Sequence, residues 1–196
     1  MSMFELLLQL IILFLVIFDP LASFAVFYVA TKHMKDKERR KIAALSITVA
    51  LGISLLFLLF GNIILTLFHT TLDEFRVAGG IVLGILGIKM ALGHPLMNLE
   101  QHKKKTGAAI AAIIGTPLLT GPAAITAILI STQDYGIVLT GTSILIVLFT
   151  TGIIFYFAKW MTRYISTTAI QIMSTVLGLI TIAWAVRFIR VGLGLP

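Results

Sequence analysis

The chain has 196 residues, with 15 Lys and Arg against 8 Asp and Glu (net charge +7), and no cysteine. Hydrophobic residues make up 59 % and charged residues 12 %, whereas a soluble domain carries roughly 25 % charged residues. A soluble protein of this length could not bury so much apolar surface, so we expect lipid to surround it. The lack of cysteine excludes disulfides, thiol redox chemistry and Cys-ligated metals.

Six hydrophobic segments predict membrane-spanning helices, because about 20 apolar residues cross a bilayer. Their expected bounds are 4–31, 41–68, 75–93, 107–132, 136–158 and 168–190. These segments leave almost no chain for a domain outside the membrane. We therefore predict an all-α polytopic membrane protein, with residues 1–196 forming a single transmembrane domain. The first residues carry Glu5 and no basic segment, so we expect no cleavable signal peptide.

The basic residues indicate the orientation of the chain. They gather in the first, third and fifth connections, at 32–41, 103–105 and 159–163, whereas the second connection offers only Arg76 and the fourth offers no Lys or Arg. Short basic loops stay in the cytoplasm. We therefore expect a multi-pass plasma-membrane (inner-membrane) protein with both termini outside. The same placement between hydrophobic segments argues against a nucleic-acid partner.

Two of the six segments contain helix breakers near their middles, at 18–23 and 115–124. Proline lacks an amide donor and clashes with the preceding turn. Unpaired backbone groups cost several kcal/mol in hydrocarbon, so such breaks persist only in protein interiors or water-lined cavities. Proline is favoured at the first position of a helix. Asp19-Pro20 and Gly121-Pro122 therefore predict the starts of second half-helices.

The two halves of the chain echo each other. Pro20 and Pro122 lie 102 residues apart, and Gly80 and Gly178 lie 98 residues apart. Glycines at 80, 84 and 178 also predict close approach of a neighbouring helix. We expect two three-helix repeats, 1–93 and 107–196, joined by a polar linker at 94–106. An odd number of helices per half requires opposite orientations, so the repeats are inverted, an architecture that recurs in transporters.

The breaks predict a binding site near the middle of the bilayer. Half-helix N-termini offer donors to a carboxylate, and free carbonyls offer acceptors to an ammonium group, the two ends of an amino acid. The candidate substrate-binding residues come from both breaks: Phe18, Asp19, Pro20, Leu21, Ala22, Ser23, Leu119, Thr120, Gly121, Pro122, Ala123, Ala124 and Thr126. The alternative is a pair of simple proline kinks whose backbone groups are satisfied by neighbouring hydroxyls.

Asp19 is the only carboxylate well inside a predicted span. An ionisable group at membrane depth predicts a role in substrate or proton handling, and capping the helix that starts at Pro20 is the competing role. In the same way, the hydroxyls of Ser23, Thr120 and Thr126 either bind substrate or satisfy the backbone.

Three motifs together resemble the MarC family of integral membrane proteins over essentially the whole chain. They lie at Phe18–Leu21, Phe75–Ile81 and Pro117–Thr126. The family includes SnatA-like small neutral amino acid transporters. The resemblance implies a multi-pass plasma-membrane protein of bacteria or archaea that moves glycine, alanine or similar amino acids.

Competing functions have less support in the sequence. We do not expect an enzyme, because Asp19 has no second acid or histidine near it in the sequence. The four histidines (His33, His69, His94 and His102) fall in loops or at helix ends, so we expect no metal site and no cofactor. A transporter of another small solute and a membrane protein without transport activity stay open. So do a coupling proton or sodium ion and a homo-oligomer.

Overall fold

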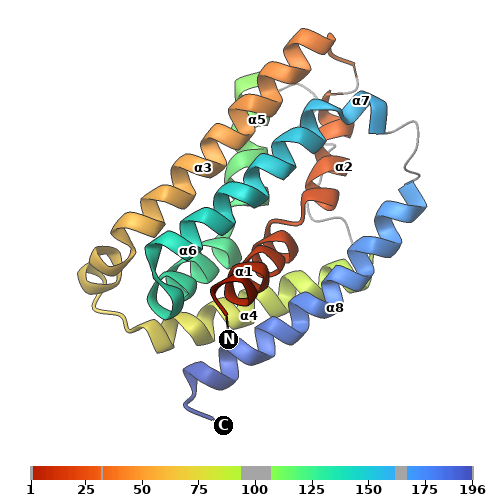
Figure 1. The fold of residues 1–196 in the computed structure, drawn as a ribbon. Helices are drawn as coiled ribbons and strands as arrows, with labels where there is room; N and C mark the ends of the chain where they lie inside the picture. The colour runs from red at the N-terminus through yellow and green to blue at the C-terminus, as the bar shows by residue number, and fades with distance from the viewer. Residues whose placement is uncertain (1, 32, 94–106, 162–166, 196) are drawn as a thin grey trace.

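The computed structural model describes residues 2–31, 33–93, 107–161 and 167–195, and their regular secondary structure is helical, without a strand. The all-α class is therefore confirmed for the described residues (Figure 1). The elements, in chain order, are α1 (Met3–Phe18), α2 (Pro20–Thr31), α3 (Asp36–Leu67), α4 (Leu72–Ala91), α5 (Gly107–Ile113), the π-helix η2 (Ile114–Leu119), α6 (Pro122–Tyr156), α7 (Ala158–Met161) and α8 (Thr167–Gly192).

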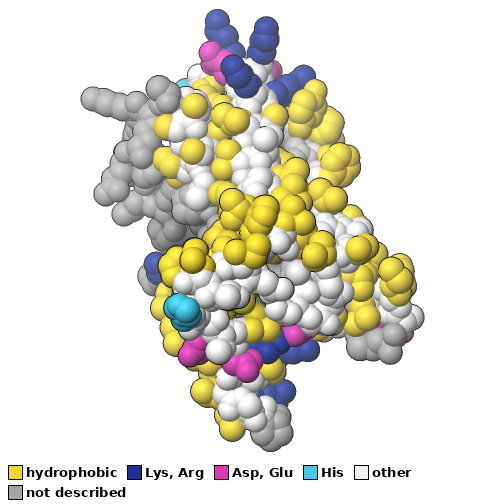
Figure 2. Space-filling view, turned by 90° about the vertical axis from the view of Figure 1, so that its left-hand side faces the viewer, with side chains coloured by type: hydrophobic (Ala, Val, Ile, Leu, Met, Phe, Trp, Pro, Cys, Tyr) yellow, Lys and Arg dark blue, Asp and Glu magenta, His cyan; other side chains and the backbone are white. Residues whose placement is uncertain are grey.

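Among the described residues, three helices are long and apolar enough to cross a membrane: α3, α6 and the part of α8 from Gln171 to Gly192. Large apolar side chains lie exposed along these helices, among them Phe149 and Leu179. On the face shown in Figure 2, yellow apolar side chains cover much of the surface, and several Lys and Arg side chains project at the upper end. Such a surface fits lipid rather than water, so the membrane protein predicted from composition is supported.

The helix starts follow from local capping. In α1 the Ser2 hydroxyl accepts the Glu5 N–H at 3.2 Å, and the Glu5 carboxylate accepts the Ser2 N–H at 2.9 Å, a reciprocal capping box. The start of α3 corrects the sequence prediction, since the helix begins at Asp36 rather than at residue 41. The acidic first turn explains the difference, because it complements the helix dipole and the Glu38 carboxylate accepts the Lys35 N–H at 3.4 Å.

Helices α4 and α8 pack antiparallel through small residues. A β-carbon on Gly80 would lie 2.8 Å from the carbonyl oxygen of Ala185 and 3.1 Å from the amide nitrogen of Ile189. The first distance is shorter than real β-carbons show and the second is unusually tight, so glycine suits the point where the backbones meet. Gly84, by contrast, would reach only the Ala185 side chain at 3.7 Å. The predicted close approach is therefore confirmed for Gly80 and wrong for Gly84.

The contact around Gly80 has a counterpart at Gly178. A β-carbon on Gly178 would lie 2.9 Å from the carbonyl oxygen of Gly87 and 2.7 Å from the amide nitrogen of Ala91. Each of these three residues stands 98 positions from the equivalent residue around Gly80. The two glycines thus meet the same kinds of backbone atom in the opposing helix.

Long-range contacts define the two ends of the bundle. At one end the Arg40 guanidinium lies 4.4 Å from the ring centroid of Tyr156, which joins the start of α3 to the end of α6. At the other end the Gln133 side-chain amide donates to the Asn62 side chain at 2.5 Å. Close to that contact Gly136 interrupts α6 with φ 83°, a backbone conformation that favours glycine.

This arrangement fits the predicted alternation of loops. The start of α3 and the end of α6 share one end of the bundle, and the connection between α3 and α4 and the Gly136 corner share the other. The predicted linker at 94–106, with its three lysines, and the basic residue Arg163 lie outside the described residues.

Candidate substrate site at the two helix breaks

The first predicted break is present at Asp19. This residue ends α1 in the left-handed conformation (φ 39°, ψ 72°), and Pro20 begins α2 directly after it. Asp and Asn tolerate this conformation better than most side chains do. The Asp19 N–H donates to the Leu15 carbonyl at 3.2 Å, and the Asp19 carbonyl accepts the Ser23 N–H at 3.0 Å. Asp19 therefore belongs to both half-helices through its backbone.

The second predicted break lies between η2 and α6. Thr120 closes η2 with its N–H donating to the Gly115 carbonyl at 3.2 Å, the wider spacing of a π-helix. Gly121 is extended (φ −70°, ψ 177°), and Pro122 occupies the first turn of α6. The predicted half-helix start is therefore present, whereas the π-helix before it was not predicted.

Three hydroxyls at the breaks bond to backbone carbonyls. Ser23 donates to the Phe18 carbonyl at 3.1 Å, Thr120 to the Gly115 carbonyl at 2.7 Å, and Thr126 to the Pro122 carbonyl at 3.0 Å. The sequence leaves two roles open for these hydroxyls, substrate binding and bonding to the backbone. In the structure all three donate to backbone carbonyls.

The helices that flank the two breaks pack against one another inside the bundle. Helix α2 contacts both η2 and α6, and α1 contacts the same two elements. Most candidate residues are buried: Phe18, Asp19, Pro20, Ser23, Leu119, Thr120, Ala123, Ala124 and Thr126. Leu21 and Gly121 are half-buried, Pro122 is exposed, and Ala22 lies in α2 with its side chain outside the described set.

Asp19 supplies the buried carboxyl group of this region. Asp19 is 3 % exposed, and it is the one buried acid among the residues that the structure describes. A buried carboxylate is expensive unless it is compensated. Asp19 is therefore the residue of this region for which the sequence predicts a role in substrate or proton handling.

Helix α4 closes the site from a side that the sequence analysis did not include. A β-carbon on Gly79 would lie 2.6 Å from the Thr126 hydroxyl oxygen. One turn earlier on α4, Arg76 forms ion pairs with Asp73 at 2.7 Å and with Asp134 at 2.5 Å. The second pair ties α4 to the far end of the α6 segment that starts at the break. Arg76 and Asp134 are 58 residues apart in the chain, and no local pattern marks their pairing.

No group of three or more His, Asp or Glu residues that could hold a metal ion occurs in the part of the chain that the structure describes. The two breaks thus contribute backbone dipoles, small buried side chains and one buried carboxyl group.

These features define a polytopic α-helical membrane protein with paired breaks in its helices. Residues 4–194 match the family described as "MarC family integral membrane protein". The chain therefore belongs to the MarC family, and the resemblance drawn from its motifs is confirmed at that level.

Relatives of similar length support this assignment. The chain is 33 % identical over 187 residues to UPF0056 membrane protein MJ1677 of Methanocaldococcus jannaschii, covering 90 % of each chain. It is 30 % identical over 185 residues to UPF0056 membrane protein PH0214 of Pyrococcus horikoshii, covering 93 % of this chain and 91 % of the relative. For UPF0056 membrane protein YhcE of Escherichia coli the identity is 29 %, with coverage of 89 % and 86 %. No solved structure matches the chain.

Proposed function

We propose that this protein transports small neutral amino acids of the glycine and alanine class across the plasma membrane. The observation that carries the proposal is the packing of α1 and α2, the helices on either side of the first break, against η2 and α6, the helices on either side of the second, with each break followed by a proline-started half-helix. Discontinuous helices of this kind form the substrate sites of many transporters. The N-termini of α2 and α6 supply positive dipole ends to a substrate carboxylate.

The remaining end of the substrate is the ammonium group. The Asp19 carboxylate and the carbonyl groups near the breaks are its natural partners. Asp19 also suits the handling of a coupling proton, with sodium as the alternative coupling ion. Both roles use a carboxylate that is buried among the half-helix ends.

The size of the substrate follows from the side chains at the breaks. Ala123 and Ala124 are buried where α6 begins, and Ser23 is buried in α2. Side chains of this size suit a compact zwitterion as the substrate. They offer no second charge for a basic or acidic amino acid and little room for a large one.

We further propose that six spans form two inverted repeats, 1–93 and 107–196. The repeated contacts of Gly80 and Gly178 support this, because antiparallel helices related by a two-fold axis make each contact twice. Transport then occurs as one repeat rocks against the other around the site. The end of the bundle that holds Arg40 faces the cytoplasm in this proposal, with both termini outside.

The proposal is tested by counterflow of labelled alanine into proteoliposomes that contain the purified protein. We expect alanine, glycine and serine to compete, whereas leucine, arginine and glutamate do not. Asp36→Asn removes an exposed carboxylate at the start of α3 and serves as a control that keeps activity. If alanine shows no counterflow and a different solute is exchanged, the proposed amino acid substrate is wrong and the substrate belongs to the class of that solute.

A further inference from the structure

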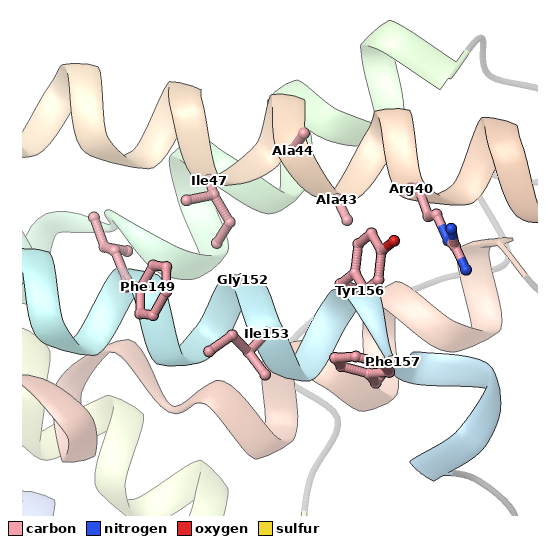
Figure 3. Close-up of a pocket in the computed structure, with 10 residues that line it drawn as sticks. Arg40, Ala43, Ala44, Ile47, Phe149, Gly152, Ile153, Tyr156 and Phe157 are labelled. Carbon is pink, nitrogen blue, oxygen red and sulfur yellow. The ribbon is translucent and has the colours of Figure 1, made fainter.

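A groove of about 410 Å³ runs along the outside of the bundle between α3 and the end of α6 (Figure 3). Small residues create it, because Ala43 of α3 and Gly152 of α6 leave space where larger side chains would meet. Ile47, Phe149 and Ile153 give it apolar walls. The groove therefore offers hydrocarbon contact along most of its length.

A cation stands at one end of this groove. The Arg40 guanidinium stacks on the Tyr156 ring, 4.4 Å from its centroid, and both residues line the groove in Figure 3. Among the described residues Arg40 makes no ion pair with a carboxylate, in contrast to Arg39 and Arg76, which both bind aspartates. The Tyr156 ring thus holds Arg40 in place while its charge stays available.

The position of the groove relative to the membrane indicates what fills it. Arg40 lies in the first turns of α3, where Lys37, Arg39, Arg40 and Lys41 precede the long apolar part of the helix. From there the groove extends toward Phe149, among the exposed apolar side chains. A ligand that follows this path needs an anionic head at the membrane surface and an apolar tail within it.

We propose that this groove binds one anionic phospholipid. The lipid phosphate binds Arg40 and the Tyr156 hydroxyl, and one acyl chain lies along Ala43, Gly152 and Phe149. Arginine pairs with phosphate through two parallel hydrogen bonds. Basic pockets between membrane helices are established sites for anionic headgroups. This lipid site is separate from the helix breaks. The test of lipid binding is therefore independent of the test of amino acid transport.

The headgroup part of the proposal is tested on the purified full-length protein in non-ionic detergent. Native mass spectrometry follows titration with phosphatidylglycerol and with phosphatidylcholine of identical acyl chains. We expect one phosphatidylglycerol to bind with at least about tenfold higher affinity. Arg40→Gln should weaken its binding by about tenfold, as expected for the loss of a charged hydrogen bond.

A matched control separates the groove from general electrostatics. Lys37→Gln makes the same change of charge on the exposed surface of α3, three residues earlier and outside the groove. Its binding of phosphatidylglycerol should stay within about twofold of the wild type. Equal losses in both variants, or no loss in Arg40→Gln, would overturn the proposal.

The acyl-chain part is tested by filling the groove. A β-carbon on Gly152 meets only the Ile47 side chain, at 3.5 Å, so Gly152→Leu adds bulk without a backbone clash. We expect this variant to lose the bound lipid, whereas Gly52→Leu, at a position of α3 with open space around it, keeps it. Ala44→Leu, at an exposed residue that also lines the groove, provides a second filled variant if Gly152→Leu does not fold.

The other candidate occupant is a second copy of the chain. Light scattering of the wild type and the filled variants distinguishes it from lipid. A dimer that disappears when the groove is filled would overturn the proposal, as would lipid binding that the filled variants leave unchanged.

Discussion

Gly80 and Gly178, 98 residues apart in the chain, occupy equivalent positions in the contact between α4 and α8. Each glycine approaches a carbonyl oxygen and an amide nitrogen of the opposing backbone, at 2.8 and 3.1 Å for Gly80 and at 2.9 and 2.7 Å for Gly178, measured from an added β-carbon. Such reciprocity is what a two-fold relation between the halves would produce. It is the structural basis on which we propose inverted repeats.

The first prediction concerns these two glycines. Gly80→Ala and Gly178→Ala should each destabilise the protein by about 1–3 kcal/mol, because the added methyl group meets backbone atoms that cannot move aside. The two losses should be similar in size, since the contacts are equivalent. Unfolding midpoints in detergent measure them, with Gly84→Ala as the control, because its new methyl meets only the Ala185 side chain at 3.7 Å. A tolerated Gly178→Ala beside a harmful Gly80→Ala would contradict the equivalence.

Local sequence signals predicted the helical framework well. Both proline-started half-helices are present, at Pro20 and Pro122, because a proline after a capping position leaves the backbone few alternatives. The sequence prediction starts α3 five residues too late. The basic stretch before residue 41 is typical of a loop, whereas Asp36 and Glu38 within it favour a helix start.

The candidate site was less predictable than the fold. The π-helix before Thr120 depends on how the chain accommodates Pro117, which has no N–H to donate, and composition alone does not fix that choice. The ion pair between Arg76 and Asp134 joins residues that are distant in the chain, so it needed the tertiary structure. Whether the hydroxyl of Ser23 faces a ligand or its own backbone is likewise a rotamer choice.

The second prediction separates the charge of Asp19 from its conformation. Asp19→Asn should fold normally, because Asn also tolerates the left-handed conformation and also caps helices. Asp19→Leu should lose about 1–2 kcal/mol of stability for the strained backbone. In proteoliposomes the Asn variant should lose pH-dependent alanine transport, with Asp36→Asn as the control. Transport by Asp19→Asn at the wild-type rate and pH profile would leave Asp19 with a structural role alone.

The third prediction is the orientation of the bundle. The chain has no native cysteine, so single cysteines report cleanly. We expect His69→Cys, in the exposed connection between α3 and α4, to react with a membrane-impermeant maleimide in intact cells. Lys37→Cys, exposed at the other end of the bundle, should react only after the cells are opened. The reverse pattern would place the basic end outside and contradict the positive-inside assignment.

The central claim, a small zwitterion bound between the two breaks, is tested most directly by substrate protection of one cysteine. Ala124→Cys adds a single sulfur atom at a residue that is 2 % exposed beside the second break, and Thr150→Cys, exposed on the same helix, is the control. We expect a small thiol reagent to label position 124 in proteoliposomes as the site opens, and alanine or glycine to slow that labelling while arginine does not. Labelling at position 150 should not respond to any of them. Labelling of Ala124→Cys at a rate that alanine leaves unchanged, or no labelling at all, would contradict the claim.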